Sequence, residues 1–197
     1  MLTESIRHCL SNLATFTGRD ARRQFWPYAA TAFGVTMLLY MVPFALLMGQ
    51  SVARMQRFMQ DHPDEAAAPV PVIVDPHAIA IDGYRPDLVP DIAIMVPLVG
   101  GTALLFIVLV AAAVTRRLHD CGLPGWPALI PAILLATGMW LMSGLFGSVA
   151  SGGEPDMSRF ALALLNNLAY LASLCLLAAC LARKGMPGTN RYGPPPA

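Results

Sequence analysis

Four stretches of the chain contain no charged residue and are mostly apolar: Phe25 to Met48, Ile92 to Val114, Trp126 to Phe146, and Ala161 to Ala182. A helix needs about 20 apolar residues to cross the hydrocarbon core of a bilayer, because each residue adds about 1.5 Å to its length. The pattern therefore predicts an all-α membrane protein with four transmembrane helices. Three prolines lie inside these stretches, and we expect kinks there and not helix ends, since neighbouring helices can satisfy the freed carbonyl groups: Pro43, Pro97 and Pro131.

The segment before the first stretch has a different pattern, in which apolar residues recur at helical spacing among polar ones. The apolar positions are Leu2, Ile6, Cys9, Leu10, Leu13 and Phe16. This spacing predicts an amphipathic helix over residues 2–16, with Gly18 as a stop. We expect it to lie flat on the membrane surface as an interfacial helix, although packing against the ends of the bundle would fit the same spacing.

The composition supports a membrane protein. Of the 197 residues, 56% are hydrophobic and 13% are charged, and the net charge is +1. Soluble domains have about 25% charged residues. These values exclude a disordered chain, a coiled coil, and nucleic-acid binding through bulk positive charge.

The distribution of Lys and Arg predicts the orientation, because cytoplasmic segments retain positive charge. Nine of the 13 lie in the N-terminal segment, the second connection and the tail, and four lie in the other two loops. Both termini are therefore expected in the cytoplasm. The predicted membrane domain comprises a cytoplasmic segment 1–24, spans 25–48, 92–114, 126–146 and 161–182, outer loops 49–91 and 147–160, a cytoplasmic turn 115–125 and a cytoplasmic tail 183–197.

The first outer loop is long and rich in proline. Residues 51–60 are expected to extend the first helix until Pro63 stops it. Short extended pieces follow, at residues 72–74 and 78–81, and they favour a small cap with a hairpin. The second outer loop is short and glycine-rich, so we expect it only to connect two spans.

Three polar clusters fall on the predicted cytoplasmic side. They are Gly18-Arg19-Asp20-Ala21-Arg22-Arg23-Gln24-Phe25-Trp26, Arg116-Arg117-Leu118-His119-Asp120-Cys121-Gly122-Leu123-Pro124-Gly125-Trp126, and Gly188-Thr189-Asn190-Arg191-Tyr192-Gly193-Pro194. In this order they resemble the bacterial inner-membrane proteins grouped as domain-of-unknown-function family 805, whose Arg-Arg-Leu-His-Asp core is specific. The resemblance implies a small helical bundle in the bacterial inner (plasma) membrane and no established activity. Pro124 and Pro127 depart from the pattern, where a serine and a second aromatic residue are usual.

The polar cluster predicted from these motifs has two interpretations. Its members are Arg19, Arg22, Arg23, Arg116, Arg117, His119, Asp120, Asn190 and Arg191. In the first, the cluster is a structural clasp: Arg116 and Asp120, four residues apart, form an ion pair, Arg117 and His119 point elsewhere, and the tail closes the cluster. In the second, spare arginines bind the phosphate of an anionic lipid head group. Aromatic residues are expected as interface anchors: Trp26, Trp126 and Tyr192.

Other function classes stay open. An oligomeric channel or transporter component is one alternative, although the four spans contain no ionisable residue, which disfavours a solitary ion-coupled carrier. A membrane enzyme acting on a lipid-linked substrate is another, with His119 as a titratable group but no nucleophile or second carboxylate beside it. We assign no catalytic residue, metal or cofactor. The expected partners are membrane lipids, anionic ones above all, and a second copy or another membrane protein, but no nucleic acid.

Overall fold

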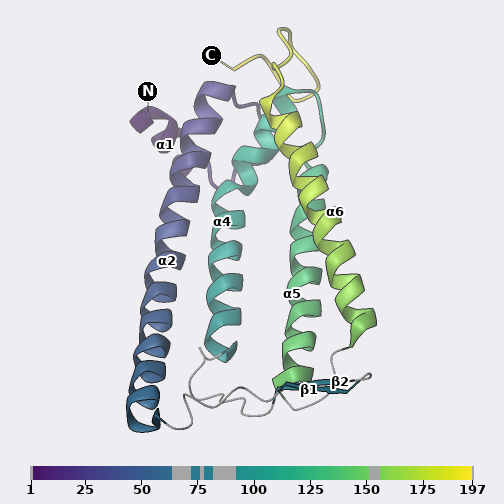
Figure 1. Cartoon of the computed structure of the whole chain (residues 1–197). Coiled ribbons are helices and arrows are strands. Elements are labelled where there is room, and N and C mark those ends of the chain that lie inside the picture. Colours follow the sequence, from purple (N-terminus) through teal and green to yellow (C-terminus); the bar gives the residue numbers. More distant parts are fainter. Residues whose placement is uncertain (1, 64–71, 76–77, 82–91, 151–155, 197) are drawn as a thin grey trace.

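The longest helix of the protein, α2 (Arg22–Asp61), contains the first span and continues well beyond it. The computed structural model describes residues 2–63, 72–75, 78–81, 92–150 and 156–196 (Figure 1). α2 runs without a break through Pro43, as predicted, and its end just before Pro63 confirms the expected extension into the outer loop. At about 1.5 Å per residue, its 40 residues make a rod of ~60 Å, about twice the hydrocarbon thickness.

The other three spans are also long apolar helices. They are α4 (Ile92–Asp120), α5 (Leu129–Ala150), which follows the short 3-10 turn η1 (Trp126–Ala128), and α6 (Met157–Ala182). All four long helices have the length and composition to cross a membrane, so the four-span prediction is confirmed. The second outer loop is shorter than predicted, because α5 runs to Ala150 and the carboxylate of Asp156 caps α6 by accepting from the N–H groups of Ser158 and Arg159.

The N-terminal amphipathic helix is present but shorter than residues 2–16. α1 (Leu2–Ser11) packs on the start of α2 and buries Ser5 and Cys9 there, while Leu2 and Leu10 stay about half exposed. After Ser11 the chain turns, with the Thr15 N–H donating to the Asn12 carbonyl, and the carbonyls of Asn12 and Thr15 also accept from Arg116 of α4. α1 therefore combines both expectations: it is docked on the bundle and presents apolar side chains outwards.

In the first outer loop, the predicted hairpin is formed by β1 (Val72–Asp75) and β2 (Ala78–Ile81). The strands pair antiparallel, from Val72 with Ile81 to Asp75 with Ala78. The remainder of this predicted proline-rich cap, residues 64–71, 76–77 and 82–91, lies outside the described residues.

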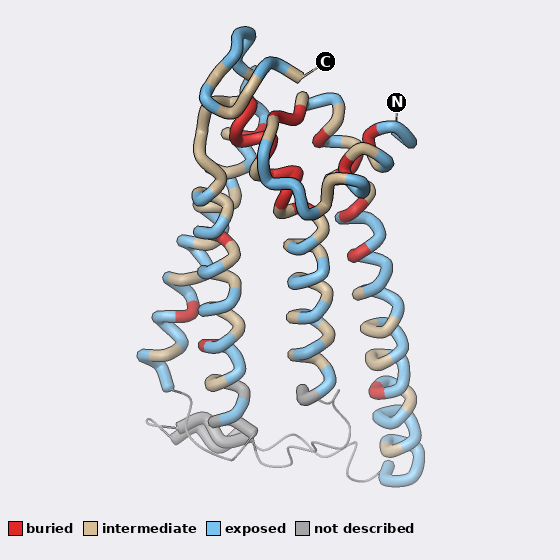
Figure 2. Tube along the Cα trace, turned by 180° about the vertical axis from the view of Figure 1, so that it is seen from behind, coloured by how far each residue is buried: buried red, intermediate tan, exposed pale blue. Residues whose placement is uncertain are grey.

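The four long helices are arranged as two pairs. α2 packs along α4, and α5 packs along α6, whereas the two pairs meet mainly through α4 (Figure 1). Both chain termini lie at the same end of the bundle, which we call the upper end. Figure 2 shows that buried residues concentrate at the upper end, while most of the surface of the long helices is exposed or half-buried. The upper end therefore holds the two pairs together.

Candidate functional site

At the upper end, Asp20 joins the N-terminal segment to α4. Its buried carboxylate accepts from Arg116 Nε at 2.9 Å and lies 3.1 Å from His8 Nε2 of α1. The same arginine donates through Nη1 to the carbonyls of Asn12 and Thr15. The predicted ion pair between Arg116 and Asp120 is therefore wrong. Arg116 points towards the N-terminal segment and pairs with Asp20 there, instead of with Asp120, which lies four positions later in α4.

Asp120 is the second acidic centre of the cluster. Its carboxylate accepts from Arg19 Nε at 3.1 Å and Nη2 at 2.9 Å, and also from Arg117 Nη1, three residues earlier on α4. Arg117, predicted to point elsewhere, is thus the partner of Asp120 within α4. It is fully buried, and its other donors reach the carbonyls of Leu181 and Arg183 at the end of α6.

Arg19 and His119 bind the C-terminal tail to the cluster. Arg19 donates to the carbonyls of Met186, Gly188 and Gly193. The His119 ring stacks on Tyr192 with 3.7 Å between ring centroids, and Asn190 donates to the His119 carbonyl at 2.9 Å. The tail therefore contacts the cluster through Asn190 and Tyr192, whereas the sequence assigned this role to Asn190 and Arg191.

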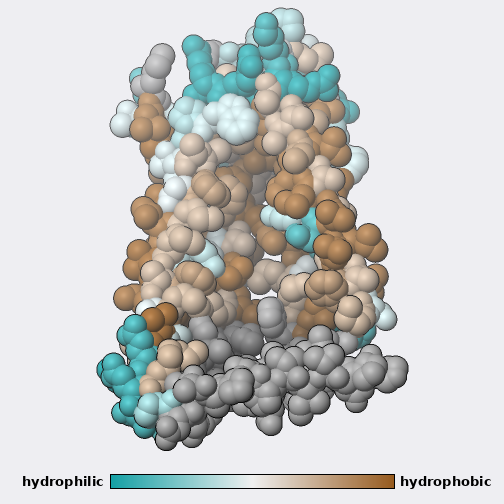
Figure 3. All heavy atoms as spheres, in the orientation of Figure 1, coloured by the Kyte–Doolittle hydropathy of each residue, from teal (hydrophilic) through white to brown (hydrophobic). Residues whose placement is uncertain are grey.

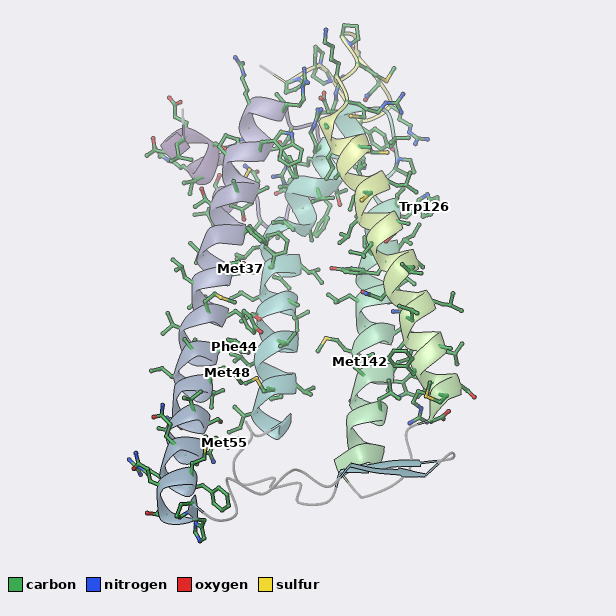
Figure 4. All side chains as sticks on the ribbon, in the orientation of Figure 1. Met37, Phe44, Met48, Met55, Trp126 and Met142 are labelled. Carbon is green, nitrogen blue, oxygen red and sulfur yellow. The ribbon has the colours of Figure 1, made fainter. Side chains whose placement is uncertain are left out.

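Tyr192, predicted as an interface anchor, takes part in this stack. Its ring stacks on the His119 ring. The Arg191 guanidinium also lies over the Tyr192 ring, 4.7 Å from its centroid. The two tryptophans differ from it: Trp26 is 42% exposed and Trp126 is 61% exposed. Figure 4 shows Trp126 at the outer surface of the bundle. Exposure at the upper end suits both as interface anchors.

Two glycines let the backbone approach the cluster. Gly18 has φ +90, a left-handed conformation that turns the chain directly before Arg19. At Gly185, a Cβ atom would lie 1.9 Å from Asp120 Oδ2. The tail therefore passes so close to the buried carboxylate that only glycine fits.

We call the five buried ions of this cluster, Arg19, Asp20, Arg116, Arg117 and Asp120, the clasp. It connects the N-terminal segment, the end of α4, the end of α6 and the tail. Nearly all its guanidinium donors have partners. Among the buried side-chain nitrogens and oxygens of the described residues, Arg116 Nη2 is the one without a hydrogen bond. Buried charges are stable only when paired and hydrogen-bonded in this way. The geometry therefore agrees with the structural interpretation of the cluster.

Two thiols border the clasp, and burial favours the protonated form of both. Burial raises the pKa of Cys9 to about 11, and the Asp20 carboxylate adds to the rise. Burial likewise raises the pKa of Cys121, whose thiol donates towards the carbonyl of Cys180 at the end of α6. Neither thiol is activated as a nucleophile. In the part of the chain that the structure describes, no group of three His, Cys, Asp or Glu side chains is placed to hold a metal.

Arg22 and Arg23 do not enter the clasp, although the sequence grouped them with it. Both are exposed at the first turn of α2, and Arg22 Nη1 donates to the carbonyl of Ala182, the last residue of α6, at 3.3 Å. Arg183 and Lys184 follow directly and are also exposed. We call these four cations the rim. Figure 3 shows hydrophilic residues gathered over this upper end.

Below the clasp, the two helix pairs separate and leave an apolar cavity of about 750 Å³. All four long helices contribute to its walls, from residues such as Phe33, Phe106, Leu135 and Leu174. Figure 3 shows this hollow between the two halves of the molecule, lined by hydrophobic residues. Two residues of its upper part lie close to the rim in the sequence: Trp26, one helical turn after Arg22, and Leu181, two positions before Arg183.

The sequence motifs thus identified most of the clasp but missed three features. Asp20 lay within the first motif and was left out of the predicted cluster, although it is the only acidic residue of that motif. The basic residues that follow α6, Arg183 and Lys184, served only to predict orientation. The cavity could not be predicted from the pattern of any one helix, because it forms where the two helix pairs diverge.

Comparison with known proteins agrees with the resemblance of the motifs. No curated protein and no solved structure matches the chain. A family model described as "Protein of unknown function (DUF805)" matches residues 13–194, from the turn after α1 to the stack around Tyr192. With four membrane-spanning helices and this match over nearly its whole length, the chain belongs to the DUF805 family of proteins of unknown function.

Proposed function

We propose that this multi-pass membrane protein is a lipid-binding protein of the bacterial inner membrane. The rim binds an anionic lipid head group, and the clasp holds the rim together. The observation that carries this proposal is the contact between Arg22 and Ala182, which places the exposed cations of α2 beside those that follow α6. The upper end then faces the cytoplasm, as the distribution of positive charge predicts.

The rim and the clasp differ in what remains available to a ligand. The clasp arginines are buried and donate to carboxylates and backbone carbonyls, so a phosphate would have to displace existing hydrogen bonds. The rim residues are exposed, and Arg22 Nη1 makes one bond to a neutral carbonyl. A guanidinium can bind a phosphate through two parallel hydrogen bonds. The rim is therefore the part of the predicted cluster suited to a head group.

Local charge favours an anion at this position. The first turn of α2 contains no acidic residue, and the start of a helix carries a partial positive charge. The two acidic residues nearby, Asp20 and Asp120, are buried, and each is paired with an arginine of the clasp. Each basic residue near a membrane surface contributes about 1 kcal/mol to the binding of anionic lipid. Four rim residues would together provide about 4 kcal/mol on that scale.

The test is lipid binding measured by native mass spectrometry on detergent-solubilised protein. Wild type is compared with Arg22→Ala/Arg23→Ala, using phosphatidylglycerol as the anionic probe and phosphatidylcholine as the zwitterionic one. The matched control is Arg54→Ala/Arg57→Ala, which removes two exposed cations from the opposite part of α2. Removing two cations at about 1 kcal/mol each lowers affinity about 30-fold.

We expect this loss for phosphatidylglycerol in the rim variant and less than a twofold change in the control. Equal binding of both lipids by wild type would contradict the proposal. An equal loss in both variants would contradict it as well, because net charge and not the rim would then determine binding.

A further inference from the structure

The cavity below the rim has mostly apolar walls. Its lining is almost entirely apolar, and its three threonine hydroxyls donate to carbonyls one turn earlier in their own helices: Thr36 to Ala32, Thr102 to Leu98, and Thr115 to Ala111. These hydroxyl protons are used within the helix, and the other polar groups of the lining are few, chiefly the hydroxyls of Tyr40 and Tyr170 and the indole N–H of Trp26. The cavity is suited to hydrocarbon.

The cavity is long and runs parallel to the helices. Lining residues on α4 run from Val99 to Thr115, which corresponds to ~24 Å along that helix. The hydrocarbon core of a bilayer is about 30 Å thick, so acyl chains of ordinary length can lie along a space of this length.

The cavity and the rim meet at the upper end. Trp26 lines the cavity and follows Arg22 by one helical turn, so the two side chains share a face of α2. On the other pair, Leu181 lines the cavity and immediately precedes Ala182, the residue that Arg22 contacts. One molecule with an anionic head and long apolar tails can therefore touch the rim and the cavity together.

We propose that the cavity between the α2–α4 pair and the α5–α6 pair holds the hydrocarbon chains of the lipid whose head group binds the rim. The ligand class is an anionic glycerophospholipid with long acyl chains. This inference rests on the proposed function for the identity of the head group. It adds that the protein selects its ligand by chain length as well as by charge.

The test separates tail binding from head-group binding. Native mass spectrometry compares phosphatidylglycerol with C18 chains and phosphatidylglycerol with C6 chains. Ala178→Trp fills the cavity, because Ala178 of α6 is exposed and lines it. Ala103→Trp fills it from α4. The matched control is Ala172→Trp, also exposed on α6 but not part of the cavity wall.

We expect wild type to bind the C18 lipid at least tenfold more tightly than the C6 lipid. Ala178→Trp and Ala103→Trp lower C18 binding to the C6 level and leave C6 binding unchanged, whereas Ala172→Trp changes neither. Circular dichroism and thermal unfolding identify variants that fail to fold. If one cavity variant misfolds, the other still tests the proposal.

Three results would overturn the inference, and each has a different consequence for the proposed function. Equal binding of C18 and C6 lipids, unaffected by tryptophan, would leave the rim as a head-group site and remove the cavity as a tail site. Equal C18 binding of anionic and zwitterionic lipids, lost in Ala178→Trp, would support a tail site but contradict the proposed function. Dimeric masses lost in Ala178→Trp would assign the cavity to a second copy of the chain.

Discussion

Arg19 and Asp120 form a buried ion pair, with 2.9 Å between Nη2 and Oδ1, although 101 positions separate them in the sequence. Arg117 binds the other carboxylate oxygen of Asp120 and also reaches the end of α6. One carboxylate thus connects the N-terminal segment, α4 and, through its arginine partners, α6 and the tail. Because the helix pairs diverge below this point, the pair Arg19–Asp120 is central to the stability of the bundle.

Replacing Asp120 by alanine is therefore expected to destabilise the protein strongly. It leaves two buried guanidinium groups without their counter-ion, and breaking a buried ion pair by removing one partner costs about 3–5 kcal/mol. Thermal unfolding in detergent measures the change. The control is Arg23→Ala, which removes an exposed arginine and is expected to change stability by less than about 0.5 kcal/mol. Similar unfolding temperatures for Asp120→Ala and wild type would show that the clasp is not structural.

Glycine at position 185 is expected to be essential, in contrast to glycine at position 188. In Gly185→Ala the new methyl group would overlap the Asp120 carboxylate, so the tail or the carboxylate has to move. At Gly188 a Cβ atom meets nothing within 4 Å. We expect Gly185→Ala to unfold at a clearly lower temperature, with a loss of about 2 kcal/mol or more as clasp bonds are disrupted. Gly188→Ala should match wild type, and equal effects of the two substitutions would refute this account of the tail.

Lysine is not expected to replace Arg117. The guanidinium donates from all three of its nitrogens, and its acceptors include the Leu181 carbonyl, the Asp120 carboxylate and the Arg183 carbonyl. A lysine ammonium keeps the charge but concentrates its donors at one point, so it cannot reach all three. We expect Arg117→Lys to cost about 2 kcal/mol, from at least one buried carbonyl left unpaired. Arg23→Lys, at an exposed position, serves as the control in the same unfolding assay. A stable Arg117→Lys variant would mean that charge alone is required there.

The sequence predicted the four spans well because each depends on a local property, a long stretch without charge. The extension of α2 was also local, since Pro63 marks its end. The partners of the arginines were harder to predict. Spacing of four residues favoured Arg116 with Asp120, but Asp20 from a distant segment takes Arg116, and Arg117 takes Asp120. Helical spacing says which residues share a face and not which distant segment covers that face.

The length of α1 was mispredicted for a similar reason. Leu13 and Phe16 continue the helical pattern of the first residues, yet the helix ends at Ser11. The carbonyls of Asn12 and Thr15 accept from Arg116. The turn after Ser11 thus contacts a distant residue of α4, a contact that local periodicity does not predict. Phe16 remains half exposed and lines the cavity.

Cys9 is expected to resist alkylation until strongly alkaline pH. Its thiol has a pKa of about 11, raised chiefly by burial, and only the thiolate reacts. A variant with Cys9 as its single cysteine should react with iodoacetamide far more slowly at pH 8 than a single-cysteine Leu10→Cys variant, whose site is 47% exposed. Rapid labelling at both positions would show that α1 does not stay docked on α2.

The same pKa makes the docking of α1 sensitive to alkali. Because the folded-state pKa is raised above the ordinary thiol value of 9.0, the protonated form favours the docked state. This contribution is complete below pH 9 and is lost as the pH rises towards 11. Between these values, we expect proteolysis of the N-terminal segment to increase in wild type but less so in Cys9→Ala, which has no proton to lose.

The proposed orientation is expected to appear in reporter fusions at positions 152 and 197. An even number of spans returns the chain to the side on which it began, and position 152 lies between the third and fourth spans. A fusion after Ala197 should therefore be active with a cytoplasmic reporter, and one at Gly152 with a periplasmic reporter. The nine basic residues around the upper end give the direction, since positive segments stay in the cytoplasm. Equal signals from both fusions would contradict the number of spans. If position 152 is found in the cytoplasm and position 197 in the periplasm, the rim faces the periplasm, and its head group comes from the outer leaflet.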